Sequence, residues 1–141
     1  MYTMNATDVR KEWSSVIDDV VRERPAFIKR TRDKMFLSDV DTMLVLLGQY
    51  HYSARRFRED DGSITLSLNE MDLVENAATE AEAKHALAEA ILEYANEYYE
   101  NYALYSASPN RREHIPYVLK ALITEDLSVL EDSIVCRSGK N

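Results

Sequence analysis

The longest helical pattern in the chain starts at Thr79 and constrains what the rest can fold into. Residues 79–82 have the composition of a helix N-cap, and the Ala-, Glu- and Leu-rich segment behind them can run to about Tyr105 before residues 108–110 interrupt it. One side of this segment is apolar and aromatic, with Leu87, Ile91, Tyr94, Tyr98, Tyr102 and Tyr105. A long helix with one such side predicts a packed lobe in the second half of the chain.

Hairpins and shorter helices are predicted around this helix. Strands are expected over residues 26–31 and 34–38, around Arg32-Asp33, and over 52–58 and 63–68, around Asp61-Gly62. Further helices are expected over 42–47, 112–122 and 127–135, and residues 137–141 are expected to fray. The predicted fold class is therefore α+β.

The first helix is predicted from its cap and its apolar spacing. Asn5 can accept a hydrogen bond from the first turn, Asp8 can reach back as in a capping box, and Pro25 ends the segment. The residues expected to form one buried stripe are Val9, Trp13, Val16 or Ile17, and Val20.

Composition and charge limit the classes of protein. The 141 residues contain 45% hydrophobic residues, only 3 Gly and 3 Pro, and one cysteine, Cys136, so we expect one compact domain or two small lobes without an internal disulfide. No signal sequence or membrane span is recognisable, so we expect a cytoplasmic protein.

Charge is divided unevenly along the chain. Residues 1–60 have 11 basic and 10 acidic residues, a net of +1, whereas residues 61–141 have 6 basic and 15 acidic residues, a net of −9. This asymmetry indicates two different partners, the acidic half suiting a basic one. The alternative is that long solvated helices simply use Glu freely.

No catalytic constellation is recognisable. His51, His85 and His114 are scattered, none at metal-ligand spacing with a cysteine or a second histidine, and three glycines leave no phosphate-binding loop. We therefore expect a binding protein, not an enzyme, with no cofactor and no metal.

Two sets of residues are candidate binding surfaces. The tyrosines are one, either as a core face or, with Tyr99 lying off their line, as a partner-binding surface. The basic residues of the first half are the other, because helix N-termini, short hydroxyl side chains and arginines are groups that hold DNA. One such face is small, so useful affinity requires a dimer that doubles it.

The opening segment resembles a known family. Residues 4–20 resemble the start of the Phd/YefM antitoxins, which have a short strand and then a capped helix with Arg two residues after the acidic capping position, here Asp8 and Arg10. Residues 25–31 look like that family's next strand, and 35–38 with 41–43 like its third strand and second helix. The match covers roughly the first 50 residues, as a strand-helix-hairpin-helix unit.

The chain departs from that pattern at two places. Arg32-Asp33 replaces the usual Gly-containing hairpin turn, and residues 50–141 predict a second hairpin and a mainly helical lobe where common members have a short tail. The longer chain looks like a Phd-like subgroup paired with RelE-type toxins.

The resemblance implies an antitoxin of a type II toxin–antitoxin system. Residues 1–50 are expected to form a homodimer that binds operator DNA and represses the operon, and residues 51–141 to bind and neutralise a RelE-type toxin. The DNA-facing residues it implies are Thr7, Arg10 and Lys11, with Arg30 and Arg32 as weaker candidates. The toxin-contact hypothesis names Tyr94, Tyr98, Tyr99 and Tyr102. The alternatives are a Phd-like transcription regulator and a dimeric adaptor, both without a toxin partner.

Overall fold

The chain folds into two compact units, each with its own sheet and its own core. The computed structural model describes residues 2–124 and 126–139, and divides the chain into Met1–Leu46 (unit 1) and Leu47–Asn141 (unit 2). The division lies at residue 46, whereas the sequence suggested residue 50. Both units combine helices and strands, so the α+β fold class is confirmed.

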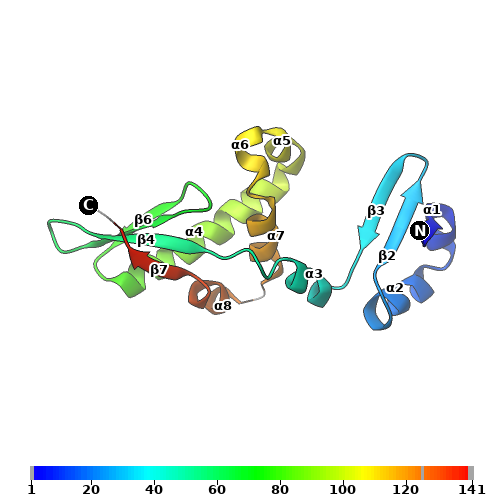
Figure 1. Cartoon of the computed structure of the whole chain (residues 1–141), viewed down its shortest axis with the longest axis horizontal. Coiled ribbons are helices and arrows are strands. Elements are labelled where there is room, and N and C mark those ends of the chain that lie inside the picture. The colour runs from blue at the N-terminus through cyan, green and yellow to red at the C-terminus, as the bar shows by residue number, and fades with distance from the viewer. Residues whose placement is uncertain (1, 125, 140–141) are drawn as a thin grey trace. The chain divides into compact units, whose positions relative to one another are not determined.

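Unit 1 is built on a three-stranded sheet. Its elements are β1 (Thr3–Asn5), α1 (Ala6–Lys11), α2 (Trp13–Arg22), β2 (Ala26–Arg30), β3 (Asp33–Leu37) and α3 (Val40–Leu46). The strand order is β1-β2-β3, with β1 parallel to β2 and β2 antiparallel to β3. The predicted first hairpin is therefore confirmed, and its two strands lie side by side in Figure 1.

The first helix starts as predicted but does not continue as predicted. The Asn5 side chain accepts a hydrogen bond from the amide of Thr7 at 2.9 Å, which confirms the N-cap. Glu12, with φ −114° and ψ 32°, then interrupts the helix and separates α1 from α2. Because the break changes the rotation of the second segment, Trp13 leaves the expected stripe and is 49% exposed. Ile17 is also exposed, and the buried residues of this core are Val9, Val16, Val20 and Ile28.

Unit 2 is built on a four-stranded sheet with one long helix. Its elements are β4 (Ser53–Arg58), β5 (Ile64–Leu68), β6 (Val74–Ala77), α4 (Glu80–Glu100), α5 (Tyr102–Ala107), α6 (Pro109–Arg112), α7 (Ile115–Ile123), α8 (Leu127–Asp132) and β7 (Val135–Ser138). The strand order is β6-β5-β4-β7. The predicted hairpin of β4 and β5 is confirmed, and β7 runs parallel to β4 (Figure 1).

The core of unit 2 lies between the sheet and α4. On β5 the buried residues alternate with half-buried ones, and Ile64, Leu66 and Leu68 face the core. From α4, Leu87 and Ile91 are fully buried against them, and Val118 of α7 closes the same cluster. The predicted packed lobe is confirmed.

Several predicted boundaries in unit 2 are wrong. The long helix ends at Glu100, because Asn101 leaves helical geometry and its side-chain amide donates to the carbonyl of Glu97 at 2.9 Å. The helix predicted over 112–122 begins at Ile115, and the one over 127–135 ends at Asp132. Residues 137 and 138, which were expected to fray, instead belong to β7, whose first amide, that of Val135, donates to the carbonyl of Tyr52 at 2.9 Å. Residues 140 and 141 lie outside the described residues.

Candidate functional site

The predicted DNA-facing residues of unit 1 are all exposed. Thr7, Arg10 and Lys11 lie on α1, Arg30 ends β2, and Arg32 lies in the hairpin turn. Arg10, Lys11 and Arg32 form no ion pair with any residue that the structure describes, so their charge is available to a partner.

Arg30 is held differently. Its Nη2 lies 3.0 Å from Oδ2 of Asp33, across the turn, with both side chains mostly exposed. The turn also holds Thr31 at φ 53°, a left-handed conformation that is unusual for a β-branched residue. The absence of a glycine from this turn, noted in the sequence, is therefore accommodated by a strained threonine beside a surface ion pair.

Unit 1 exposes more large apolar side chains than it buries. Against the four buried residues of its core, the exposed ones are Tyr2, Trp13, Ile17, Val21, Phe27, Met35, Phe36, Val40, Leu44, Val45 and Leu46. An apolar groove of about 670 Å³ lies between α1 and the hairpin, with Trp13, Met35 and Phe36 in its wall and Arg10 at its rim. Exposed apolar surface of this extent marks an interaction site.

The tyrosines of unit 2 divide into core and surface residues. Tyr98 is fully buried, and its hydroxyl donates to the carbonyl of Arg111 at 2.8 Å. Its ring packs edge-on against Tyr94, Tyr102 and Tyr105, with centroids 5.4 to 6.0 Å apart. Tyr98 is therefore a core residue, and the hypothesis that it contacts a partner is dropped.

The other three predicted tyrosines are accessible to different extents. Tyr99 is 65% exposed and Tyr102 is 36% exposed, whereas Tyr94 is half-buried with its hydroxyl 2.7 Å from Nδ1 of His114. Sequence reasoning missed Leu104, which is 70% exposed on α5. The feature that could have revealed it is the helix break at Asn101. Because of this break, the residues of α5 do not continue the apolar side of α4.

Burial favours the neutral forms of the tyrosine and histidine rings in this cluster. Burial raises the pKa of the Tyr94 and Tyr98 phenols and lowers the pKa of His114. The Arg111 guanidinium lies 4.0 Å from the centroid of the Tyr105 ring, and the Tyr105 hydroxyl donates to Glu97 at 2.7 Å. These contacts fix the junction of α4, α5 and α6, and they leave Tyr99, Tyr102 and Leu104 exposed beside it.

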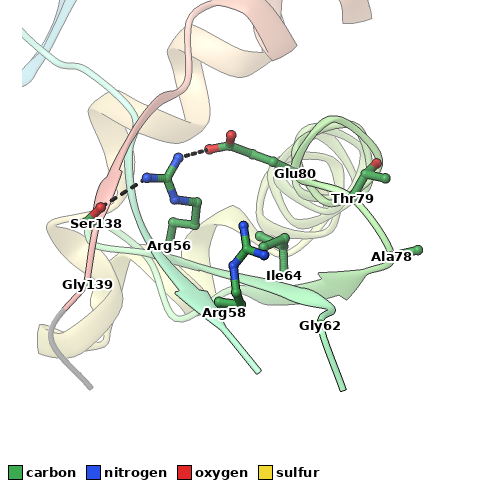
Figure 2. Close-up of a pocket in the computed structure, with 9 residues that line it drawn as sticks. All are labelled: Arg56, Arg58, Gly62, Ile64, Ala78, Thr79, Glu80, Ser138 and Gly139. Carbon is green, nitrogen blue, oxygen red and sulfur yellow. Dashed lines mark hydrogen bonds and ion pairs between the residues drawn. The ribbon is translucent and has the colours of Figure 1, made fainter. Parts of the chain in front are cut away.

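Unit 2 has a hollow at the N-terminus of α4. Figure 2 shows Arg56 and Arg58 reaching from β4 toward that helix end, in a cavity of about 640 Å³. Nη1 of Arg56 lies 3.0 Å from Oε1 of Glu80, and Nη2 donates to Oγ of Ser138 at 3.0 Å. Because Glu80 already neutralises Arg56, this hollow contains its own anion, and the contacts join β4, β7 and α4.

Neither a metal cluster nor a membrane span is found in residues 2–124 and 126–139. No three His, Cys, Asp or Glu side chains in that part of the chain gather as metal ligands. His85 is paired instead with carboxylates, at 2.6 Å from Glu89 and 2.9 Å from Glu131. No helix there is both long and apolar enough to cross a membrane.

The surfaces of the two units define the class of protein. Its prominent surfaces are an apolar and basic face on unit 1 and an aromatic, acidic junction on unit 2, both of which suit contacts with other macromolecules. It is a two-unit α+β protein with the features of a binding module.

Comparison with known proteins identifies the family. Residues 1–135 match the Phd-like family model, described as antitoxin of toxin–antitoxin, RelE/RelB, TA system. The chain is also similar to a crystal structure from Syntrophomonas wolfei subsp. wolfei, described as an antitoxin part of a proposed toxin/antitoxin system. The two are 34% identical over 99% of this chain and 100% of that one, with a TM-score of 0.93. No curated protein matches the chain. The chain therefore belongs to the Phd-like antitoxin family, and the resemblance found at its start is confirmed.

Proposed function

We propose that this antitoxin neutralises a RelE-type toxin by direct binding and represses its own operon as a DNA-binding homodimer. The observation that carries the proposal is the surface of unit 1, which combines unpaired basic side chains with large apolar side chains that are exposed to water in a single copy of the chain. DNA binding is assigned to unit 1 and toxin binding to unit 2, so the two activities can be tested separately.

Apolar exposure on unit 1 supports a dimer. β3 is exposed on both of its faces, with Met35 and Phe36 each 46% exposed, and the Phe27 and Phe36 rings lie 5.3 Å apart across the hairpin. Fully burying an exposed side chain of this kind contributes about 1.5–3 kcal/mol, so completing the burial of Met35 and Phe36, already about half buried, contributes roughly half of that each. A second copy of unit 1 presents a matching apolar surface, as a two-fold interface requires.

The first turns of α1 support the DNA contact. Thr7 offers a hydroxyl near the helix N-terminus, while Arg10 and Lys11 extend from the next turn. Arginine and lysine can both bind guanine edges as well as phosphates, and the planar fork of Arg10 suits the guanine edge better than the single ammonium of Lys11 does. Arg32 is a weaker candidate, and Arg30 weaker still because Asp33 partly neutralises it.

The junction of α4 and α5 supports the toxin contact. Tyr99, Tyr102 and Leu104 are exposed there beside the carboxylates of Glu97 and Glu100. Residues 61–141 have a net charge of −9, from 6 basic and 15 acidic residues, which would attract a basic toxin and speed association. Tyr94 can contribute only its exposed edge.

The DNA half is tested by fluorescence anisotropy with the chain's own upstream DNA. Arg10→Ala should weaken operator binding by about 1–3 kcal/mol, with Arg112→Ala, an exposed arginine of unit 2, as the matched control. An affinity unchanged by Arg10→Ala would remove α1 from the operator contact. The dimer is tested by sedimentation: Phe36→Ser should shift the protein toward monomer, whereas Val129→Ser in unit 2 should not.

The toxin half is tested by calorimetry with the small basic product of a neighbouring reading frame. Tyr99→Ala combined with Leu104→Ala should raise the Kd at least tenfold, while Val129→Ala, which removes another exposed apolar side chain, from α8, should leave it unchanged. If the variant with Tyr99→Ala and Leu104→Ala bound the toxin as tightly as the wild type does, the toxin site would have to lie elsewhere. A neighbouring product that does not bind at all would favour the regulator without a toxin partner.

A further inference from the structure

The sheet of unit 2 has two chemically different faces. The face toward α4 is apolar, with Ala54, Leu66 and Leu68 buried. The opposite face, named here the open face, carries Arg55, Phe57, Thr65, Asn76 and Arg137, all half-buried or exposed. Sheets that are covered on one side and polar on the other normally face water or a partner.

Two arginines are neighbours on the open face. Arg55 of β4 and Arg137 of β7 are register partners in the parallel pair, so their Cα atoms are neighbours about 4.8 Å apart and their side chains leave the same face. Both are exposed, and neither forms an ion pair with a residue that the structure describes. Like charges in this arrangement destabilise a sheet.

This pair is unexpected in an acidic unit. Residues 47–141 contain 9 basic and 17 acidic residues, a net charge of −8. Four of those nine basic residues lie on just two adjacent strands: Arg55, Arg56, Arg58 and Arg137. On the face toward α4, Arg56 is paired with Glu80, and Arg58 lies in the same hollow as that carboxylate. Arg55 and Arg137 are the two of the four that lie together on the open face.

The pair lies beside an aromatic ring and several hydrogen-bonding side chains. The Arg55 guanidinium lies 5.8 Å from the centroid of the Phe57 ring, and Phe57 itself packs over Gly139. On the neighbouring strands the Asn76 amide donates to Oγ1 of Thr65 at 2.9 Å. The carboxylate at this margin, Glu70, is occupied by the amide and hydroxyl of Ser53.

We propose that the open face binds the phosphate backbone of DNA, through Arg55 and Arg137, as a second and sequence-independent contact of the repressor. Arginines, hydroxyls and side-chain amides are the groups that contact phosphates and sugars, and a phosphate between the two guanidinium groups would remove their mutual repulsion. A basic toxin is disfavoured here by the same charges. The inference rests on the proposed DNA binding and adds a site in unit 2.

The test is the salt dependence of DNA binding by the full chain. Each lost phosphate contact should lower the slope of log K against log salt by about 1, so Arg55→Ser with Arg137→Ser should lower it by about 2 and weaken binding by an order of magnitude or more. Because phosphates carry no sequence information, the loss should be equal on operator and scrambled DNA. The melting temperature should stay the same or rise, since repulsion has been removed.

The controls separate this inference from the proposed function. Arg137→Ser is compared with Arg112→Ser, which removes one exposed guanidinium from α6 and should not change the slope. If the double variant binds DNA like the wild type while Arg10→Ala weakens operator binding, the inference is overturned and the repressor function stands. If the double variant loses binding but Arg10→Ala does not, the open face stands and the role of α1 falls. If the wild type binds neither operator nor scrambled DNA, both the inference and the repressor function are overturned. If the double variant loses affinity for the toxin alone, the open face is assigned to the toxin contact.

Discussion

The Tyr94 hydroxyl lies 2.7 Å from Nδ1 of His114, which joins the long helix α4 to the turn before α7. The two rings also pack edge-on, with centroids 5.7 Å apart. Burial is the main cause that lowers the pKa of His114, so burial favours the neutral imidazole as the partner of the tyrosine. The relationship makes the packing of this junction sensitive to acid.

Stability should therefore fall as the pH drops below about 6.5, the ordinary pKa of histidine. The unfolded chain binds a proton at His114 more readily than the folded chain, because the folded pKa is lowered. The stabilisation by neutral His114 is complete above the unfolded pKa, and is lost as the pH falls from there through the folded pKa. Urea unfolding at pH 7.5 and pH 5.0 should show a smaller difference for His114→Gln than for the wild type. Equal differences would show that His114 does not contribute.

The same substitution at two neighbouring tyrosines should change the stability by very different amounts. Tyr98→Ala should cost about 3–5 kcal/mol of unfolding free energy, because it empties the centre of the aromatic cluster. Tyr98→Phe should cost about 1 kcal/mol, the value of its hydrogen bond to Arg111.

Tyr99→Ala is the matched surface variant, because Tyr99 is 65% exposed on the same turn of α4. It should change stability by less than about 0.5 kcal/mol. The pair is compared by denaturant unfolding of the full chain, and a Tyr99→Ala loss as large as that of Tyr98→Ala would contradict the assignment of Tyr98 to the core.

The N-cap of α1 should matter both for stability and for DNA. Asn5→Ala removes the acceptor for the Thr7 amide and should cost about 1 kcal/mol. Because that turn carries Thr7 and precedes Arg10, operator affinity should fall with it. Asn5→Asp keeps an acceptor and should restore stability but not operator affinity, because its carboxylate would repel DNA phosphates beside Thr7; thermal melts and anisotropy would measure the two quantities. Failure of Asp to restore stability would mean that the cap does not hold this turn.

Local signals in the sequence were enough for much of the fold. The caps at Asn5 and Thr79 and the turn at Asp61-Gly62 depend on residues close in sequence, and each appears where it was predicted. Strands β6 and β7 were not predicted, because each is only four residues long and shows no clear alternation. β7 forms only because β4, some 80 residues earlier, offers a free edge.

The surfaces were harder to predict than the helices and strands. Tyr98 and Tyr99 are adjacent, and helical spacing placed Tyr98 on the apolar side without revealing that α6 would cover it completely. Trp13 was assigned to the core because the break at Glu12 has no strong sequence signal. The Arg55 and Arg137 pair depends on strand order, which no local pattern contains.

Gly139 should be intolerant of even one added methyl group. A Cβ at this position would overlap the ring of Phe57, whose atom Cδ1 would lie 2.9 Å away. Gly139→Ala must therefore displace the ring or separate the end of β7 from β4. The two segments are joined there by the Gly139 amide, which donates to the Arg56 carbonyl at 2.7 Å. We expect a loss of about 1–3 kcal/mol, as for other overpacked sites, measured by denaturant unfolding. Combining Gly139→Ala with Phe57→Ala should recover part of that loss, because the added methyl group then has room.

Gly62→Ala is the control for a purely conformational cost: Gly62 has φ 86° and open space around it, so its loss should be about 1 kcal/mol, and Phe57→Ala should not relieve it. Equal behaviour of the two glycines would show that Phe57 does not pack on Gly139.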